Sequence, residues 1–277
     1  MRGLRLPGGQ ELPVLGQGTW GMGERRAQRA AEVAALRRGL DLGLGLIDTA
    51  EMYGSGGAEE VVGAAIAGRR DEVFLVSKVY PHNAGRRDAV AACERSLRRL
   101  GTDHLDLYLL HWRGSTPLAE TLDAFEQLRA DGKVRHFGVS NFGPGDMSEL
   151  FEGELGRRSA TNQVLYNLTR RGIELDLLPW CREQGLPVMA YSPIEQGRLL
   201  GEPALRRVAE RHSVTPAQIA IAWVLAQDGV CAIPKAATVA HVEQNRAALD
   251  IELSAADLAE LDAGFPAPPH PVPLEIL

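Results

Sequence analysis

Short apolar runs alternate with amphipathic stretches along the whole 277-residue chain. Continuous apolar runs without strict alternation are typical of strands that are covered on both faces. Such runs predict eight strands, at 13–15, 44–47, 73–76, 105–110, 137–139, 161–165, 187–190 and 230–233. Helical spacing of apolar residues predicts helices at 27–42, 58–67, 88–100, 117–130, 173–184 and 216–227, followed by two more at 239–249 and 255–263.

Capping residues mark several of these helices. Gly101 and Gly185 directly follow predicted helix ends, and Thr215-Pro216 provides an N-cap and a first-turn proline. Strand–helix alternation predicts an α/β fold with a parallel sheet, and eight such units in 277 residues predict one (β/α)8 (TIM) barrel domain over 1–277. We expect residues 1–12 to form a β-hairpin that caps the barrel floor, and the last two helices to be C-terminal additions.

Composition narrows the functional classes. With 45% hydrophobic and 24% charged residues the chain is predicted to be globular, and its net charge of -6 argues against nucleic-acid binding. No apolar run approaches the roughly 18 residues that a membrane span needs, and the N-terminus lacks a signal-peptide core. We therefore expect a monomeric cytoplasmic protein. Its cysteines, Cys93, Cys181 and Cys231, are predicted to be reduced and buried, and no sequence pattern predicts a metal site.

Lysine is scarce in this chain. Of 30 basic residues only Lys78, Lys133 and Lys235 are lysines. Lysine carries a compact charge whose pKa moves on burial, whereas arginine is a wide planar fork, so the lysines are candidates for special roles. Lys133 lies in an Asp-Gly-Lys turn, and we assign it no function.

Polar residues follow three successive predicted strands. Barrel chemistry lies at the C-terminal strand ends, so Asp48, Lys78 and His111 should converge, with Tyr53 on the loop after Asp48. The pKa of tyrosine, near 10, is lowered by a nearby ammonium, which Lys78 can supply while Asp48 keeps it charged. Such a phenol can protonate a developing oxyanion while His111 orients the carbonyl. A nicotinamide would supply the missing hydride.

The first predicted strand leads into Gly16-Gln17-Gly18-Thr19-Trp20-Gly21, which matches the G-x-G-x-x-G pattern. A Rossmann fingerprint needs the third glycine to open a helix, but here another glycine follows at Gly23. We interpret these glycines as a close backbone approach at a strand end. Thr19 and Trp20 would then face cofactor or substrate.

Six segments in order resemble the aldo-keto reductase family, and the resemblance covers essentially the whole chain. They are Ile47–Gly54, Ser77-Lys78, Leu110-His111-Trp112, Gly138–Phe142, Ala190–Pro193 and Ile233-Pro234-Lys235. Lys78-Val79-Tyr80-Pro81 and Ala236-Ala237-Thr238 are similar to a bacterial subgroup that reduces methylglyoxal and other aldehydes.

The resemblance implies a role for each of these residues. Tyr53 would be the general acid, Lys78 and Asp48 would tune it, and His111 would orient the substrate. The implied cofactor contacts are Ser140, Asn141 and Gln163 at the carboxamide, Tyr191 on the nicotinamide ring, Ser192 and Ile194 along the pyrophosphate, and Lys235, Thr238, Gln244 and Asn245 around the adenosine phosphate and adenine, with Gly18, Thr19 and Trp20 at the first strand end. The implied reaction is direct hydride transfer from NADPH to small aldehydes and 2-oxoaldehydes such as methylglyoxal, giving alcohols.

The adenosine end departs from the family pattern. Ala236 and His241 stand where relatives often carry Ser and Arg. A histidine with its ordinary pKa near 6.5 is mostly neutral at pH 7, so it donates weakly to a 2′-phosphate. We therefore expect a smaller preference for NADPH over NADH than is usual.

Several interpretations stay open. Tyr80 either contacts substrate or only shapes its loop; Trp20 and Trp112 either wall the pocket or pack at its rim; Glu51 is either a bystander or an outer partner of the catalytic set. Lys78 as a Schiff-base lysine of an aldolase is an alternative enzyme reading, but Asp48 would keep it charged. A cofactor-bound redox-sensing subunit is a third reading, although it has no need of a tuned phenol. Short loops and a brief tail after Phe265 favour an open pocket for small electrophiles.

Overall fold

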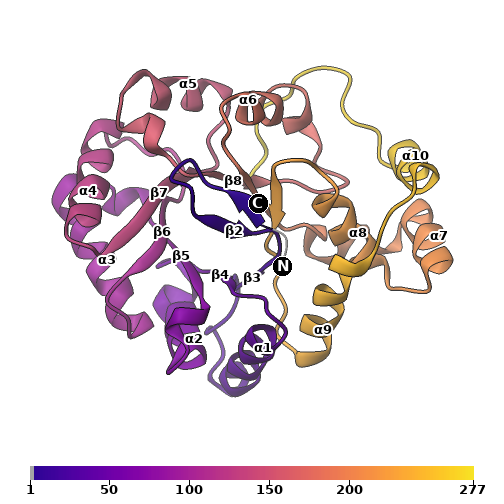
Figure 1. Cartoon of the computed structure of the whole chain (residues 1–277), viewed down its shortest axis with the longest axis horizontal. Coiled ribbons are helices and arrows are strands. Elements are labelled where there is room, and N and C mark those ends of the chain that lie inside the picture. The colour runs from indigo at the N-terminus through magenta and orange to yellow at the C-terminus, as the bar shows by residue number, and fades with distance from the viewer. Residues whose placement is uncertain (1–2) are drawn as a thin grey trace.

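The computed structural model describes residues 3–277, and its centre is a barrel of eight parallel strands ringed by helices (Figure 1). Each strand pairs with its sequence neighbour, and the first and last strands meet through parallel bridges from Leu15 to Ala232 and from Gly18 to Lys235. The predicted (β/α)8 barrel is confirmed. Its strands are β3 (Gly16–Gly18), β4 (Leu46–Asp48), β5 (Phe74–Val79), β6 (Leu105–Leu110), β7 (Val134–Ser140), β8 (Asn162–Leu165), β9 (Val188–Tyr191) and β10 (Val230–Ala232).

Helices on the outside follow most of the predicted positions. They are α1 (Arg29–Asp41), α2 (Gly57–Ile66), α3 (Arg86–Leu100), α4 (Leu118–Ala130), α5 (Pro144–Glu152), α6 (Leu177–Glu183), α7 (Pro203–His212), α8 (Pro216–Leu225), α9 (Val239–Ala247) and α10 (Ala255–Gly264). The caps formed as predicted, since Gly101 ends α3 with a φ of 64° and Thr215 forms a capping box with Gln218. Helix α9 packs beside α1, and α10 packs against α7 outside the ring (Figure 1).

One strand prediction was wrong. The apolar run at 13–15 is not the first barrel strand, because Pro13 ends the hairpin strand β2 (Glu11–Pro13) and the barrel strand begins at Gly16. A Gly-Gln-Gly strand has no apolar pattern to reveal it. Gly18 is needed there for a close approach, since a Cβ at this position would lie 2.7 Å from the carbonyl oxygen of Ile233.

An N-terminal hairpin closes one end of the barrel. Strand β1 (Gly3–Arg5) pairs antiparallel with β2, and in Figure 1 the hairpin lies across the barrel centre. Leu6 and Leu12 are buried in the cluster that fills the barrel interior. The predicted floor cap is therefore confirmed for the described residues, while residues 1 and 2 lie outside them.

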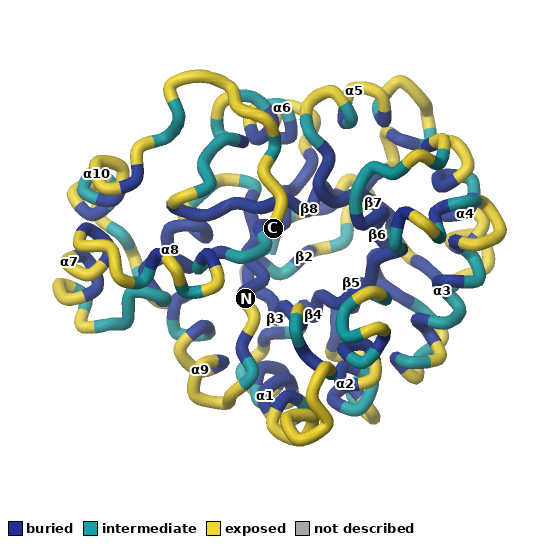
Figure 2. Tube along the Cα trace, turned by 180° about the vertical axis from the view of Figure 1, so that it is seen from behind, coloured by how far each residue is buried: buried dark blue, intermediate teal, exposed yellow. Residues whose placement is uncertain are grey.

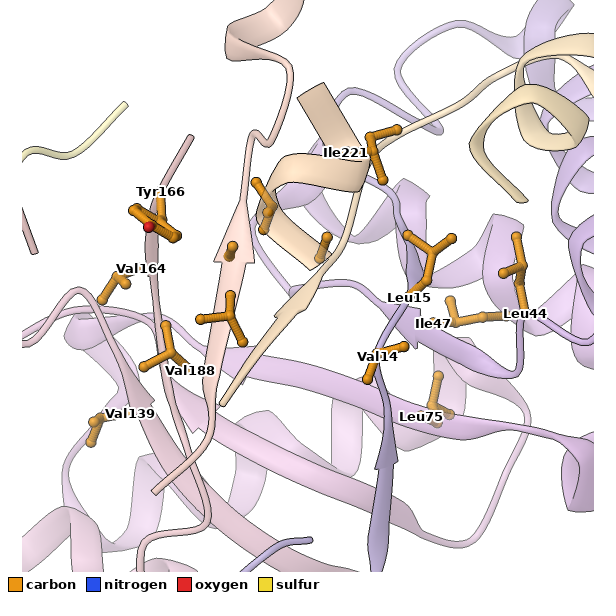
Figure 3. Packing of buried hydrophobic residues seen from close by; sticks show 14 of the residues in the cluster. Val14, Leu15, Leu44, Ile47, Leu75, Val139, Val164, Tyr166, Val188 and Ile221 are labelled. Carbon is orange, nitrogen blue, oxygen red and sulfur yellow. The ribbon is translucent and has the colours of Figure 1, made fainter. Parts of the chain in front are cut away.

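Alternation along the strands decides which side chains face the barrel axis. Figure 2 shows that the strands are buried and that the exposed residues lie on the surrounding helices and loops. Leu46 and Val76 belong to the interior cluster. Their neighbours Ile47 and Leu75 belong to the outer cluster, and Figure 3 shows them in the same packed layer as Ile221 of α8. Because successive strand residues point to opposite faces, the next inward positions are Asp48 on β4 and Lys78 on β5. The hydrophobic pattern thus places both charged groups at the open end of the barrel.

Within residues 3–277 no helix is both long and apolar enough to cross a membrane. The three cysteines are free and buried, which agrees with the predicted buried thiols. The same stretch of chain contains no group of three or more His, Cys, Asp or Glu side chains arranged to hold a metal ion.

Candidate active site

The C-terminal ends of the strands surround a cavity of about 610 Å³. Its volume lies in the range of small-molecule and cofactor sites. The lining contains most of the residues predicted from the strand ends: Gly18, Thr19, Trp20, Asp48, Tyr53, His111, Trp112, Ser140, Asn141, Gln163, Tyr191, Ser192, Ile194 and Lys235.

Lys78 lies directly behind this lining and is fully buried. Its Nζ donates to Asp48 Oδ2 at 2.7 Å, to the main-chain oxygen of Thr49 at 2.9 Å and to the Tyr53 hydroxyl at 3.3 Å. These three acceptors use all three ammonium protons. The Tyr53 oxygen therefore accepts from lysine and keeps its own proton available to the cavity.

Burial governs the electrostatics of this group. Burial is the largest single influence and lowers the pKa of Lys78, but Asp48 and Tyr53 together outweigh it and the net shift is upward. The pKa of Tyr53 is raised above its ordinary value because burial disfavours the phenolate, and the ammonium of Lys78 opposes this only in part. Lys78 does lower the pKa of Tyr53, as expected, but burial has the larger effect and the net shift of this pKa is upward. Tyr53 is therefore a neutral phenol near pH 7.

His111 sits edge-on to Tyr53, with ring centroids 5.6 Å apart. Burial, with the nearby charge of Lys78, lowers the pKa of His111 to about 2, so the imidazole is neutral. Its Nδ1 is buried without a hydrogen-bond partner. Nε2 is thus the ring nitrogen left open to a ligand in the cavity.

A second layer of hydrogen bonds fixes Asp48. Gln163 Nε2 donates to Asp48 Oδ1 at 2.7 Å, and the Thr19 hydroxyl donates to the main-chain oxygen of Asp48 at 2.9 Å. Both carboxylate oxygens of Asp48 are therefore occupied. Gln163 and Thr19 therefore connect Asp48 to the part of the cavity in which cofactor contacts were predicted.

The amide side of the cavity is a connected network. Ser140 Oγ donates to the main-chain oxygen of Gln163 at 2.8 Å, and Asn141 Nδ2 donates to the main-chain oxygen of His111 at 3.0 Å. The Tyr191 hydroxyl donates to Asn141 Oδ1 at 2.9 Å. Asn141 adopts a φ of 58°, a conformation that asparagine tolerates better than most residues. These contacts hold amide groups and one aromatic ring at the cavity surface.

The loop after β9 is held by a buried carboxylate that the sequence did not reveal. Glu195 accepts from Asn167 Nδ2 at 2.8 Å and forms ion pairs with Arg170 at 3.0 Å and Arg198 at 2.8 Å. Ser192 and Glu195 have φ values of 50° and 48°. Burial, the contacts with Asn167 and the two arginines, and the left-handed backbone distinguish Glu195 from a surface glutamate, and none of these features is visible in the sequence.

Four predicted cofactor residues lie beyond the cavity lining. They belong to α9 and its N-cap Thr238, whose hydroxyl oxygen accepts from the main-chain N–H of His241 at 3.3 Å. Thr238, His241 and Gln244 are exposed, and Asn245 is buried. Ala236 is also buried, so it offers no polar group to a ligand.

The cavity lining also contains aromatic and apolar residues, among them Trp20 and Trp112. Trp20 is 58% exposed at the cavity rim. Tyr80 does not line the cavity; its ring meets Trp112 edge-on at 4.9 Å and stacks on His82 at 4.6 Å. Residues of the lining that the sequence analysis missed include Met52, Pro193, Gln196, Ile276 and Leu277.

The C-terminal segment after Phe265 forms part of the cavity lining. Residues that follow Phe265 return to the barrel mouth, where Ile276 and Leu277 line the cavity. Glu275 forms an ion pair with Arg170, which anchors this segment. The tail therefore forms part of the cavity lining, and no local pattern in the sequence signals where a proline-rich tail will lie.

The residues present fit a nicotinamide dinucleotide. The cavity offers amide groups from Asn141 and Gln163 for a carboxamide, the Tyr191 ring for stacking and the Lys235 ammonium for a phosphate. In the same cavity the Tyr53 phenol is a possible proton donor and His111 offers a neutral imidazole. Such an arrangement suits proton transfer to an oxygen beside a bound redox cofactor.

Comparisons with known proteins give a consistent result. The model described as "Aldo/keto reductase family" matches residues 14–264. Methylglyoxal reductase YeaE of Escherichia coli is 57% identical over 99% of this chain and 98% of its own length. Glyoxal reductase of Bacillus subtilis is 36% identical over 94% of this chain and 91% of its own length.

Solved structures agree with the sequence matches. A crystal structure of an aldo/keto reductase from Klebsiella pneumoniae, in complex with NADP and acetate, superposes with a TM-score of 0.97. The two chains are 54% identical, and the match covers 99% of each. A thermostable aldo-keto reductase, Tm1743, in complex with epalrestat, has a TM-score of 0.89 at 38% identity, covering 95% of this chain and 100% of that one.

Proposed function

The chain belongs to the aldo/keto reductase family, and from this membership we propose that it reduces small aldehydes and 2-oxoaldehydes such as methylglyoxal to alcohols with NADPH. One observation carries the mechanism. The Lys78 ammonium is buried between the Asp48 carboxylate at 2.7 Å and the Tyr53 hydroxyl at 3.3 Å. That hydroxyl is the general acid of the proposal.

Each member of the group has one task. Tyr53 holds a proton at the cavity surface and releases it to the carbonyl oxygen as negative charge develops there. Lys78 stabilises the phenolate that remains, since its ammonium already donates to the same oxygen. Asp48 keeps the lysine charged, and neutral His111 donates one hydrogen bond that aligns the carbonyl. A bound nicotinamide would supply the hydride, transferred directly to the carbonyl carbon.

The charge of the lining supports a neutral substrate. Of the cavity-lining residues in the described chain, Lys235 is the only lysine or arginine. In the proposal that residue binds the cofactor phosphate, so the aromatic wall of Trp20 and Trp112 is left to the substrate. An uncharged carbonyl compound with a small apolar substituent suits that wall better than a keto acid does.

The two alternatives are less compatible with these contacts. A Schiff-base lysine must lose its proton, whereas Lys78 has a raised pKa and three hydrogen-bond acceptors. A cofactor-bound sensing subunit would not need a proton donor, although it remains an outcome of the test below. On the cofactor we propose that NADPH is preferred over NADH by a reduced margin, since Ala236 is buried and His241 replaces a permanent cation.

The test is NADPH consumption with methylglyoxal and with benzaldehyde, using wild type, Tyr53→Phe and a matched control. Tyr108→Phe is that control, since the Tyr108 hydroxyl is buried without a partner on the outer side of β6. We expect wild type and Tyr108→Phe to turn over alike, and Tyr53→Phe to lose at least about 10²-fold in kcat/KM.

The other outcomes separate the hypotheses. Turnover that survives Tyr53→Phe would keep the reductase and remove the assigned acid. Tight NADPH binding without turnover of either aldehyde in wild type would favour the sensing role. Trapping of a lysine adduct by borohydride with a carbonyl substrate would favour the aldolase.

A further inference from the structure

Two loops at the barrel mouth are joined by a carboxylate outside the catalytic group. Glu51 lies in the loop after β4, two residues before Tyr53, and its side chain is only 8% exposed. Its Oε1 accepts from the main-chain N–H of Tyr80 at 2.8 Å and from Asn83 Nδ2 at 2.9 Å, both in the loop after β5. One oxygen atom therefore ties the loop that carries the acid to the loop that follows Lys78.

The other side of the same carboxylate is less engaged. Glu51 Oε2 faces Arg95 of α3 at 3.6 Å, which is longer than a hydrogen bond, and the Arg95 side chain is 41% exposed. A pair of this kind contributes little to stability. The two short hydrogen bonds to Oε1 are the contacts that hold the loops together.

The loop held by Glu51 supports the aromatic wall. The Tyr80 ring meets Trp112 edge-on at 4.9 Å, and Trp112 in turn lies 4.9 Å from His111. Trp112 and His111 line the cavity, and Tyr80 stands behind them. The position of the wall therefore depends on where the backbone of Tyr80 is held.

The acid is held by separate contacts. Lys78 reaches Tyr53 while bound to Asp48 and to the main-chain oxygen of Thr49, and none of these atoms belongs to Glu51. Loss of the Glu51 side chain would thus release the wall and leave the proton donor in place.

We propose that Glu51 is a positioning residue that fixes the Tyr80–Trp112 wall relative to Tyr53, and so sets the affinity for the apolar part of a carbonyl substrate. This inference rests on the proposed reductase function. It assigns substrate selection to a residue that touches neither substrate nor cofactor. It also accounts for Tyr80, which shapes the wall from behind.

The experiment measures kcat and KM separately for methylglyoxal and phenylglyoxal in wild type, Glu51→Ala, Glu51→Gln and Asn83→Ala. In Glu51→Ala we expect KM for phenylglyoxal to rise about ten- to hundredfold, because a contact surface displaced near the reacting centre weakens substrate binding by about that factor. We expect a smaller rise for methylglyoxal, little change in kcat, and an unchanged Kd for NADPH. Asn83→Ala removes one of the two hydrogen bonds and should show a weaker form of the same change.

Glu51→Gln is the conservative variant. Its amide oxygen can accept from Tyr80 and Asn83, so we expect KM to return to within about threefold of wild type. Glu94→Ala is the matched control. Glu94 lies on α3, does not line the cavity, and its carboxylate forms an ion pair with Lys133 at 2.6 Å. This variant should leave both constants unchanged.

A merely structural role gives a different pattern. It would lower the active fraction, and hence kcat, while KM stays the same for both substrates, and this result would overturn the proposal. A Glu51→Gln variant as impaired as Glu51→Ala would also overturn it, since charge and not the hydrogen-bonded loop would then matter.

A crystal structure of Glu51→Ala provides a readout that does not need turnover. We expect a shifted 80–83 loop and Trp112 ring with the Tyr53–Lys78 contact intact; an unmoved wall would refute the inference. If wild type reduces neither compound, the proposed function fails, and this structure still decides whether Glu51 holds the wall.

Discussion

Acid stability offers a direct test of how His111 is buried. The ordinary pKa of a histidine in an unfolded chain is near 6.5, whereas burial beside Lys78 lowers the pKa of His111 to about 2 in the folded protein. The unfolded chain therefore binds one more proton than the folded one between these two values. The stability associated with this group is fully present above pH 6.5 and is lost progressively as the pH falls toward 2.

The size of the effect follows from the lower pH chosen. A pH of 5 lies about 1.5 units below the pKa of the histidine in the unfolded chain, whereas the folded histidine is still neutral. At about 1.4 kcal/mol per pH unit, the free energy of unfolding therefore falls by about 2 kcal/mol. His111→Gln removes the titration and keeps a polar side chain. We expect the free energy of unfolding in urea to fall by about 2 kcal/mol more in wild type than in the variant between pH 7.5 and pH 5.

Other groups that titrate in this window are present in both proteins and cancel in the difference. His136, whose pKa burial also lowers, is one of them. Equal pH dependence of wild type and His111→Gln would show that the imidazole binds its proton as readily in the folded protein as in the unfolded chain. The lowered pKa of His111, and with it the burial argument for a neutral donor, would then be refuted.

Three further predictions concern the charges of the site. Asp48→Asn leaves the Lys78 ammonium buried without its carboxylate, so we expect urea unfolding to show a loss of about 3–5 kcal/mol. Lys235→Met should weaken NADPH binding about tenfold or more in a fluorescence titration while NADH binding changes less, since a charged donor to the 2′-phosphate is removed. Methyl 4-formylbenzoate should have a kcat/KM at least about tenfold above that of 4-formylbenzoate, because the carboxylate finds no second cation in the lining; equal values would contradict this account of the wall.

The parts of the fold that the sequence predicts are those fixed by local rules. The run at 105–110 matches β6 at both ends, because six consecutive buried residues leave no ambiguity about a strand covered on both faces. Gly101 and Thr215 give helix ends to the residue, since an αL cap and a capping box are written in adjacent positions. The candidate catalytic residues Asp48, Lys78 and His111 are predicted by the same rules, because they stand where apolar strands end.

Other parts depend on contacts that are distant in the sequence. The prediction placed strand β3 too early in the sequence. Its position is set by the closure of the barrel against the chain that follows β10, where Gly18 meets Ile233, and not by a hydrophobic pattern within β3. Helices α5 and α7 were missed, and both begin at a proline, at Pro144 and Pro203. Proline is favoured in a first turn, so each of these was a usable start signal. The tail gave no such signal, since its place depends on contacts that are distant in the sequence, such as the ion pair between Glu275 and Arg170 and the packing of Leu274 against the core.

The raised pKa of Tyr53 changes what the neighbouring lysine is for. If Lys78 served to bring the phenol near neutral pH, part of the protein would hold a phenolate, which cannot donate a proton. Burial instead keeps the phenol protonated, and the ammonium 3.3 Å away becomes most favourable once negative charge appears on that oxygen. In the proposed mechanism the lysine therefore acts chiefly on the transition state and its product. That requires a compact cation that can be buried beside a carboxylate, which explains why a chain that uses arginine almost everywhere keeps a lysine at position 78.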